Sequence, residues 1–215
     1  MAKGFRRRGR GADERFVAVL DEAERGVVVG LLEQVRDLLD DAYEDEPGAA
    51  PGTPEETGDP AFDAIVSGLG GMGQGVSVAA EDQVDLSASP DPALARLFPP
   101  AHRDDDEVAA QFRAMAQDGL RDRKLANLRT AIAALRAASD KHVRLGRPDA
   151  TALMVALTDV RLVLAERIGV HTEEDSERLR EIAANADPDE PIVYASAVYD
   201  FLSWLQEGLA EALLP

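Results

Sequence analysis

Apolar residues recur at intervals of three and four over most of this chain of 215 residues, and no other sequence feature limits its fold as strongly. This spacing gives an α-helix one apolar face that can pack against a core. It predicts an all-α, single-domain bundle over residues 1–215 with about five to seven helices. The segments that carry the pattern are about 21–41, a short one after 59, 91–98, about 104–140, 150–168, 172–186 and 191–213.

Local signals mark the ends of several of these helices. Asp21 followed by Glu24 has the spacing of a capping box. Gly169 is expected to end the 150–168 helix, and Pro191 suits a first helical turn because no partner is needed there for its missing N–H. The 150–168 helix is apolar on nearly every side, so we expect it to be the most buried one.

The segment at about 104–140 is the longest, and its apolar phase changes midway. The stripe that begins at Val108 lies roughly 150° around the helix from the stripe that begins at Leu125, with Gly119 between them. We interpret this segment as one long helix that kinks or changes its packing partner near Gly119. Two separate helices are the alternative.

The first twenty residues follow a different pattern. In residues 15–20 the side chains of Phe16, Ala18 and Leu20 alternate with those of Arg15, Val17 and Val19, as in a β-strand with two different faces. Gly9 and Gly11 suit the turn of a hairpin. Residues 1–20 are therefore predicted to be a basic arm or a short β-hairpin.

The charge is unevenly distributed along the chain. Lys and Arg number 23 against 41 Asp and Glu, which gives a net charge of −18, yet the first ten residues contain no acid. The strongly acidic remainder repels nucleic acid, so nucleic-acid binding is only weakly expected. The candidate contacts for it are Lys3, Arg6, Arg7, Arg8 and Arg10, and a solvated terminal strand is the alternative.

Neither membrane insertion nor secretion is indicated by the sequence. No apolar run approaches the roughly 18 residues that a spanning helix needs. The basic start is not followed by the apolar segment of a signal peptide. We expect a cytoplasmic protein with no membrane partner. The chain contains no cysteine, which excludes disulfides and thiolate chemistry.

No motif in the chain indicates catalysis, so we expect no catalytic residue, no cofactor and no metal. Residues 44–59 and 68–89 are rich in Pro or Gly and are predicted to be flexible loops. Gly68–Gly73 has the letters of GxGxxG but lacks the preceding strand and following helix that phosphate binding requires. Asp104–Glu107 is expected to cap a helix rather than bind a cation.

Three polar residues of the helices are predicted to be structural: Arg113, Asp159 and Arg161. Asp159 is expected to face away from the apolar stripe of its helix. Arg161 lies close to the centre of that stripe. We therefore expect it either to extend its guanidinium to solvent or to pair with a buried carboxylate.

The last helix, 191–213, has an unusually wide apolar face. Tyr199, Phe201, Trp204 and Leu205 form its candidate partner or dimer surface, since Trp and Tyr are enriched at interfaces. Either this face is covered by the rest of the domain or it is shared with a second chain in a homodimer.

Several strings in the chain resemble one known family when taken together: 91–99, 103–105, 111–113 and 157–162. The chain is similar to an actinobacterial all-helical family, described as a domain of unknown function, that includes the oxidative-stress transcriptional regulator AosR. The resemblance implies an all-helical fold and a protein that acts through protein contacts. The redox role of that regulator rests on paired cysteines, which this chain lacks, so thiol sensing is assigned to no position here.

These observations lead to one functional hypothesis and two alternatives. The hypothesis is a non-enzymatic, cytoplasmic regulatory protein whose partner is another protein. The first alternative is a DNA-associated transcriptional regulator that uses the Arg-rich N-terminal arm. The distant alternative is an enzyme with a metal bound by the carboxylates of 104–107.

Overall fold

The computed structural model describes residues 2–41, 91–98 and 107–215, and for residues 107–118 it gives the course of the helix only. Six α-helices and a small sheet make up the described part, so the fold is mainly α, as predicted. In chain order the elements are β1 (Lys3–Arg8), a 3-10 turn (Gly11–Asp13), β2 (Arg15–Val19), α1 (Glu22–Asp41), α3 (Pro92–Leu97), α4 (Glu107–Arg136), β3 (His142–Leu145), α5 (Arg147–Arg167), α6 (Glu173–Asn185) and α7 (Pro191–Leu213).

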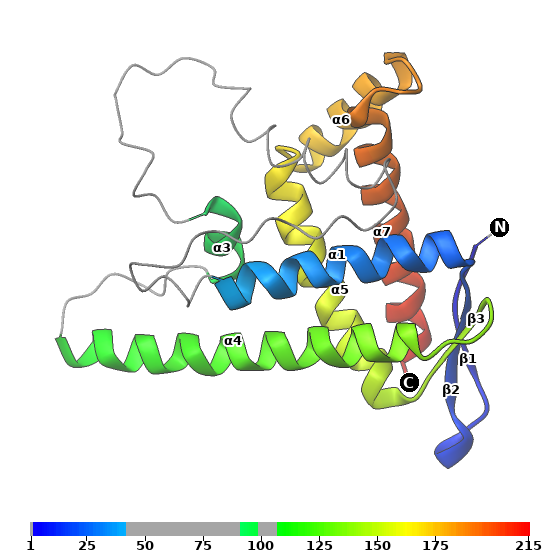
Figure 1. The fold of residues 1–215 in the computed structure, drawn as a ribbon, viewed down its shortest axis with the longest axis horizontal. Helices are drawn as coiled ribbons and strands as arrows, with labels where there is room; N and C mark the ends of the chain where they lie inside the picture. The colour runs from blue at the N-terminus through cyan, green and yellow to red at the C-terminus, as the bar shows by residue number, and fades with distance from the viewer. Residues whose placement is uncertain (1, 42–90, 99–106) are drawn as a thin grey trace.

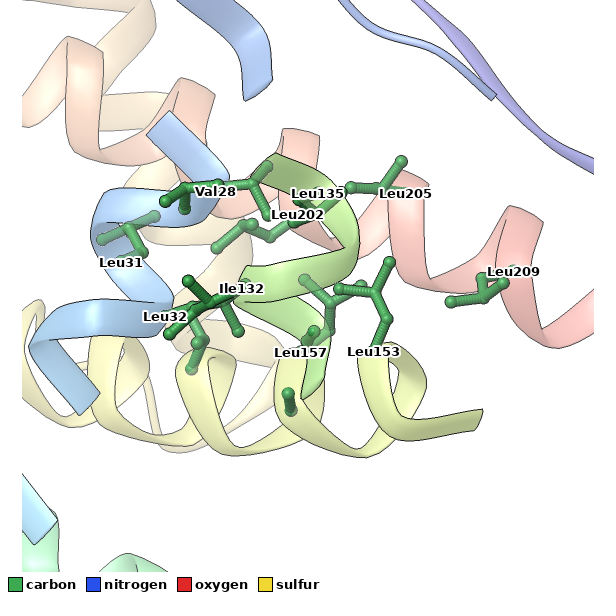
Figure 2. Close-up of a cluster of buried hydrophobic side chains, with 14 of the residues drawn as sticks. Val28, Leu31, Leu32, Ile132, Leu135, Leu153, Leu157, Leu202, Leu205 and Leu209 are labelled. Carbon is green, nitrogen blue, oxygen red and sulfur yellow. The ribbon is translucent and has the colours of Figure 1, made fainter. Parts of the chain in front are cut away.

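Helix α5 is the centre of the bundle, as its apolar sequence predicted. It contacts α1, α3, α4 and α7. Leu153 and Leu157 are fully buried. Figure 2 shows them beside Ile132 of α4, with Leu32 of α1 and Leu202 of α7 in the same cluster. Each fully buried leucine contributes about 1.5–3 kcal/mol through its removal from water.

Helices α1 and α4 lie side by side and cross α5 (Figure 1). Helix α4 continues through Gly119 without a break, so the alternative of two separate helices is wrong. It ends at Arg136, before the predicted end near 140. The reason is that Asp140 turns the chain, because its carboxylate accepts a hydrogen bond from the backbone N–H of His142 at 2.7 Å, where β3 begins.

The three strands form an antiparallel sheet in the order β1-β2-β3, at one end of the long helices (Figure 1). The predicted hairpin is the β1-β2 pair. Strand β3 was not predicted, and it pairs with β2 so that Phe16 lies opposite Leu145 and Val19 lies opposite His142.

The predicted helix ends have the expected hydrogen bonds. The backbone N–H of Glu24 donates to Asp21, and the backbone N–H of Asp21 donates to Glu24, both at 2.8 Å. After α5, Gly169 has a φ of +70°, and the N–H of Val170 donates to the carbonyl of Ala165 at 2.8 Å. This is the left-handed glycine cap that ends many helices.

None of the helices in the described part of the chain is long and apolar enough to cross a membrane. The predicted loops 44–59 and 68–89, and the short helix expected after 59, lie outside the described residues.

Candidate interaction surface

Most basic residues of the sheet lie on its outer face, which points away from the helices. Successive side chains of a strand point to opposite faces. Phe16, Ala18, Val143 and Leu145 are buried and face the helices. The residues that alternate with them along β2 and β3 face outward: Arg15, Val17, Val19, His142 and Arg144.

The strand register brings further basic side chains of β1 onto this outer face. Arg6 lies opposite Val17, and Val17 lies opposite Arg144, so these three residues form one row across the sheet. Directly opposed residues in an antiparallel pair share a face, with Cβ atoms about 4.5–5.5 Å apart. Lys3, Val19 and His142 form a second row, and Arg8 lies opposite Arg15.

We call the outward-facing set Lys3, Arg6, Arg8, Arg15 and Arg144 the basic face. Arg8 and Arg15 are like charges in directly opposed positions, an arrangement that destabilises a sheet. Within the described residues, no carboxylate contacts Lys3, Arg6 or Arg8. A cluster of unneutralised charge that costs stability is a feature expected of a binding surface rather than of a structural one.

Two members of the basic face have partners within the protein. Arg144 contacts the carboxylate of Asp140 at 3.2 Å. The hydrogen bond from the His142 N–H lowers the pKa of Asp140, and the Arg144 contact adds to this effect. The guanidinium of Arg15 donates to the backbone carbonyls of Ala12 and Glu14, which are uncharged partners.

Of the five predicted nucleic-acid contacts, Arg7 lies on the other side of the sheet. It is opposite Phe16, which is buried, and its guanidinium contacts Glu14 at 2.6 Å and the carbonyl of Leu214 at 3.0 Å. Arg7 is therefore a structural residue. Lys3, Arg6 and Arg8 are exposed on β1, and Arg10 is exposed in the turn that follows.

Strand β1 is held closely against α7. Gly4 and Gly208 meet at this contact, and a Cβ atom on Gly208 would lie 3.4 Å from the backbone nitrogen of Phe5. A Cβ atom at either position would already be in van der Waals contact, so side chains larger than alanine have little room there. This packing fixes the position of the basic face relative to the helical core.

The predicted partner surface on α7 is only partly exposed. Leu205 is fully buried, so its assignment to a surface is wrong. The cause is that α7 packs against both α5 and β1, which covers the apolar stripe of Leu202, Leu205 and Leu209. Trp204 is 40% exposed, stacks on Phe201 with ring centroids 5.9 Å apart, and lies against Gly4. Tyr199 is half-buried beneath Arg161.

Asp159 is buried on the side of α5 that faces α4. It is 2% exposed because α4 covers this side of α5, and its Oδ1 lies 2.5 Å from the Nζ of Lys124. Burial raises the pKa of Asp159, and the Lys124 ammonium opposes that increase. The side chain of Arg113 lies outside the described residues.

Arg161 is half-buried, and no carboxylate among the described residues pairs with it. Its Nη1 donates to Oε1 of Gln206 at 2.6 Å, and its guanidinium carbon lies 5.4 Å from the ring centroid of Tyr199. A neutral amide and an aromatic ring hold this cation in place.

Metal ligands are not clustered in the part of the chain that the structure describes, where no group of three or more His, Asp or Glu could hold an ion. Residues 68–73 and the side chains of Asp104–Glu107 lie outside the described part of the structure. Sequence reasoning identified Lys3, Arg6 and Arg8 but not their neighbours Arg15 and Arg144, because the register of β2 and β3 brings them together.

A family model for a domain of unknown function, DUF2017, matches residues 2–213. No curated protein and no solved structure matches the chain.

Proposed function

We propose that this chain, which belongs to the DUF2017 family, is a cytoplasmic, non-enzymatic regulatory protein that binds another protein through the basic face of its sheet. The observation that carries the proposal is the set of exposed cations on β1, Lys3, Arg6 and Arg8, which no carboxylate contacts within the described residues. These cations stand out on a protein whose net charge is −18.

The chemistry of the basic face fits an acidic segment of a partner protein. Guanidinium groups bind carboxylates through two parallel hydrogen bonds, which gives both energy and geometric specificity. Val17 and Val19 are half-buried and are the middle residues of the two rows, so they offer a small apolar contact at the centre of the face. We therefore expect a partner segment that combines Asp or Glu with an apolar residue.

Duplex DNA suits this surface less well. Three strands are only about 10 Å wide, so a duplex on them would bring its phosphates close to the acidic remainder of the protein. No Phe, Tyr or Trp is among the outward-facing residues of the three described strands, so the His142 imidazole is the one ring there on which a base could stack.

A DNA-associated regulator remains the second candidate because the same unpaired arginines, Arg6 and Arg8, can also bind phosphates. In that case a partner protein must hold the acidic body on the DNA. Either way, the proposed mode of action is like that of the co-regulator AosR. The absence of cysteine means that the trigger cannot be a thiol.

The test uses the full chain as bait in extracts of its native cell and identifies captured proteins by mass spectrometry. The bait variant Arg6→Glu/Arg8→Glu/Arg144→Glu reverses three charges of the basic face. Its control, Arg123→Glu/Arg129→Glu/Arg180→Glu, makes the same charge change at exposed positions on α4 and α6. The proposal expects a protein captured by the wild type and the control but not by the basic-face variant.

Binding to duplex DNA at two salt concentrations separates the second candidate from the first. Affinity that falls steeply with salt and is abolished by the basic-face variant would favour the DNA-associated regulator. Capture of the same proteins by all three baits would contradict both candidates as stated here.

A further inference from the structure

A cavity of about 310 Å³ lies where α3, α5, α6 and α7 meet, on a different part of the molecule from the basic face. This volume is at the lower end of the range of about 300–1,000 Å³ that is usual for small-molecule sites. Its lining combines the cation Arg161 and the hydroxyl group of Thr158 with apolar side chains such as Leu162 and Val170.

The Arg161 guanidinium is fixed by its neighbours but is not saturated by them. Its Nη1 donates to Gln206, whose Nε2 in turn donates to the hydroxyl of Thr158 at 2.7 Å. Its Nε is buried and has no hydrogen-bond partner among the described residues. The Nε–Nη2 edge, which binds carboxylates and phosphates through two parallel hydrogen bonds, therefore has an unused donor.

Other shielded cations nearby are neutralised. Lys124 pairs with Asp159, Arg121 lies 3.5 Å from Asp40, and Arg167 pairs with Asp91. Arg161 contacts no carboxylate within the described residues, only Gln206 and the Tyr199 ring. Because a shielded cation is costly unless it is paired with an anion, Arg161 is the position in this cavity that an anionic group would stabilise.

Among the described residues, the opposite wall of the cavity contains no cation that is free to bind an anion. Arg96 is already engaged, since its Nε donates to Glu166 at 2.8 Å and its Nη2 lies 2.5 Å from Nδ1 of His171. The same Nδ1 of His171 lies 3.5 Å from Oε2 of Glu166, so Arg96, Glu166 and His171 form one cluster. Glu173 also lines this side and repels anions. The anionic group of a ligand therefore belongs on the Arg161 side.

We propose that this cavity binds a small molecule that carries a carboxylate or phosphate group, and that Arg161 holds that group. Leu162 and Val170 contact the rest of the ligand. This site is independent of the basic face and of the proposed function.

The test is an NMR titration of the isotope-labelled full chain at constant ionic strength maintained with chloride. The probes are inorganic phosphate and succinate, with succinamide as the uncharged analogue of succinate. At least one anion should give saturable shifts of the Arg161 Nε–H resonance and of the amides of residues 170–173, and succinamide should give none. Shifts that stay linear with both anions, or that succinamide reproduces, contradict the proposal.

Three variants locate the binding. Arg161→Met should weaken the affinity for the anion roughly tenfold or more, the loss expected for a charged hydrogen-bond partner. Arg123→Met, at an exposed site on α4, should leave the affinity unchanged. Arg161→Lys keeps the positive charge but lacks the two parallel N–H donors of a guanidinium. It replaces Arg161→Met in the test if the methionine variant does not fold. Unchanged affinity in the folded Arg161 variant overturns the proposal.

The basic-face variant Arg6→Glu/Arg8→Glu/Arg144→Glu should bind both anions as the wild type does. This comparison separates a failure of the cavity site from a failure of the proposed function. If the anions bind at the basic face instead, their shifts will disappear in this variant and persist in Arg161→Met, which contradicts the cavity site.

Discussion

Nε of Arg147, in the first turn of α5, lies 2.8 Å from Oε2 of Glu14, the residue before β2. This contact ties the N-terminal hairpin to the central helix. Arg7 of β1 contacts the other oxygen of the same carboxylate at 2.6 Å. The Arg147 hydrogen bond is the main reason that the pKa of Glu14 is below its usual value, and Arg7 adds to the effect.

Glu14→Gln should lower the melting temperature near neutral pH and have little effect in acid. The pKa of Glu14 is lower in the folded chain than the ordinary value of 4.5, so its contribution to stability is present above that value. The contribution is lost as the pH falls through the folded-state pKa. Thermal unfolding of both proteins over a range of pH measures this. A deficit that is the same at neutral pH and in strong acid contradicts the account.

Lys124→Met should destabilise the protein by about 3–5 kcal/mol near neutral pH, because it leaves the buried Asp159 carboxylate without a counter-charge. Burial already raises the pKa of Asp159 above the ordinary 3.8, and removal of Lys124 raises it further. A raised carboxyl pKa means that the folded state holds its proton to higher pH, so stability falls as the pH rises. The cost of Lys124→Met should therefore grow with pH in urea denaturation.

The double variant Lys124→Met/Asp159→Leu is the control for that prediction. It removes both charges, and a buried ion pair replaced by apolar groups is often neutral or stabilising. We expect it to recover most of the stability that Lys124→Met loses and to have lost the pH dependence of the single variant. A double variant as unstable as Lys124→Met would show that packing, not charge, causes the loss.

Gly9→Ala should destabilise the hairpin more than Gly11→Ala. Both glycines have positive φ, +73° and +61°, a backbone conformation that costs an alanine roughly 1–2 kcal/mol. A Cβ at Gly9 would also lie 2.4 Å from the carbonyl oxygen of Asp13, whereas a Cβ at Gly11 would have no neighbour within 4 Å. Denaturation midpoints of the two variants test this, and equal losses would contradict the turn geometry.

Trp204 packs against Gly4 and so stabilises the contact between α7 and β1 within one chain. We therefore expect light scattering at low and high salt to give the mass of a monomer, 23.1 kDa. Trp204→Glu should lower the melting temperature without changing this mass, since it removes a ring stack worth about 0.5–1.5 kcal/mol. A mass of two chains that falls to one in Trp204→Glu would instead support the homodimer.

Local features of the fold were predictable, and features that depend on distant contacts were not. The Asp21–Glu24 capping box and the Gly169 cap depend on residues a few positions apart, so the sequence alone contains the signal. Strand β3 has only four residues, too few for its alternation to stand out from chance. Its pairing with β2 places Arg144 in the same row as Arg6, with Val17 between them, and no local pattern indicates that arrangement.

The burial of Asp159 could not be predicted from the pattern of its own helix, because a second helix covers its side of α5. Asp159 lies opposite the apolar stripe of α5, which for a helix on the surface means exposure to solvent. Helix α4 packs on that side as well, and Lys124 supplies the compensating charge from 35 positions earlier in the chain. Leu205 was misassigned because the helix pattern does not show whether the same chain or a second chain covers an apolar stripe, and here α5 and β1 of the same chain cover it.

The central claim is that the basic face is the surface that contacts a partner protein, and site-specific photo-crosslinking in the native cell tests it most directly. The photoreactive phenylalanine analogue replaces Val17, at the centre of the row between Arg6 and Arg144, or Ile182, which is 50% exposed on α6. We predict that position 17 crosslinks to a distinct protein through an acidic segment, that position 182 does not, and that Arg6→Glu/Arg8→Glu abolishes the product. If position 17 gives no protein crosslink, or gives the same products as position 182, the claim is contradicted.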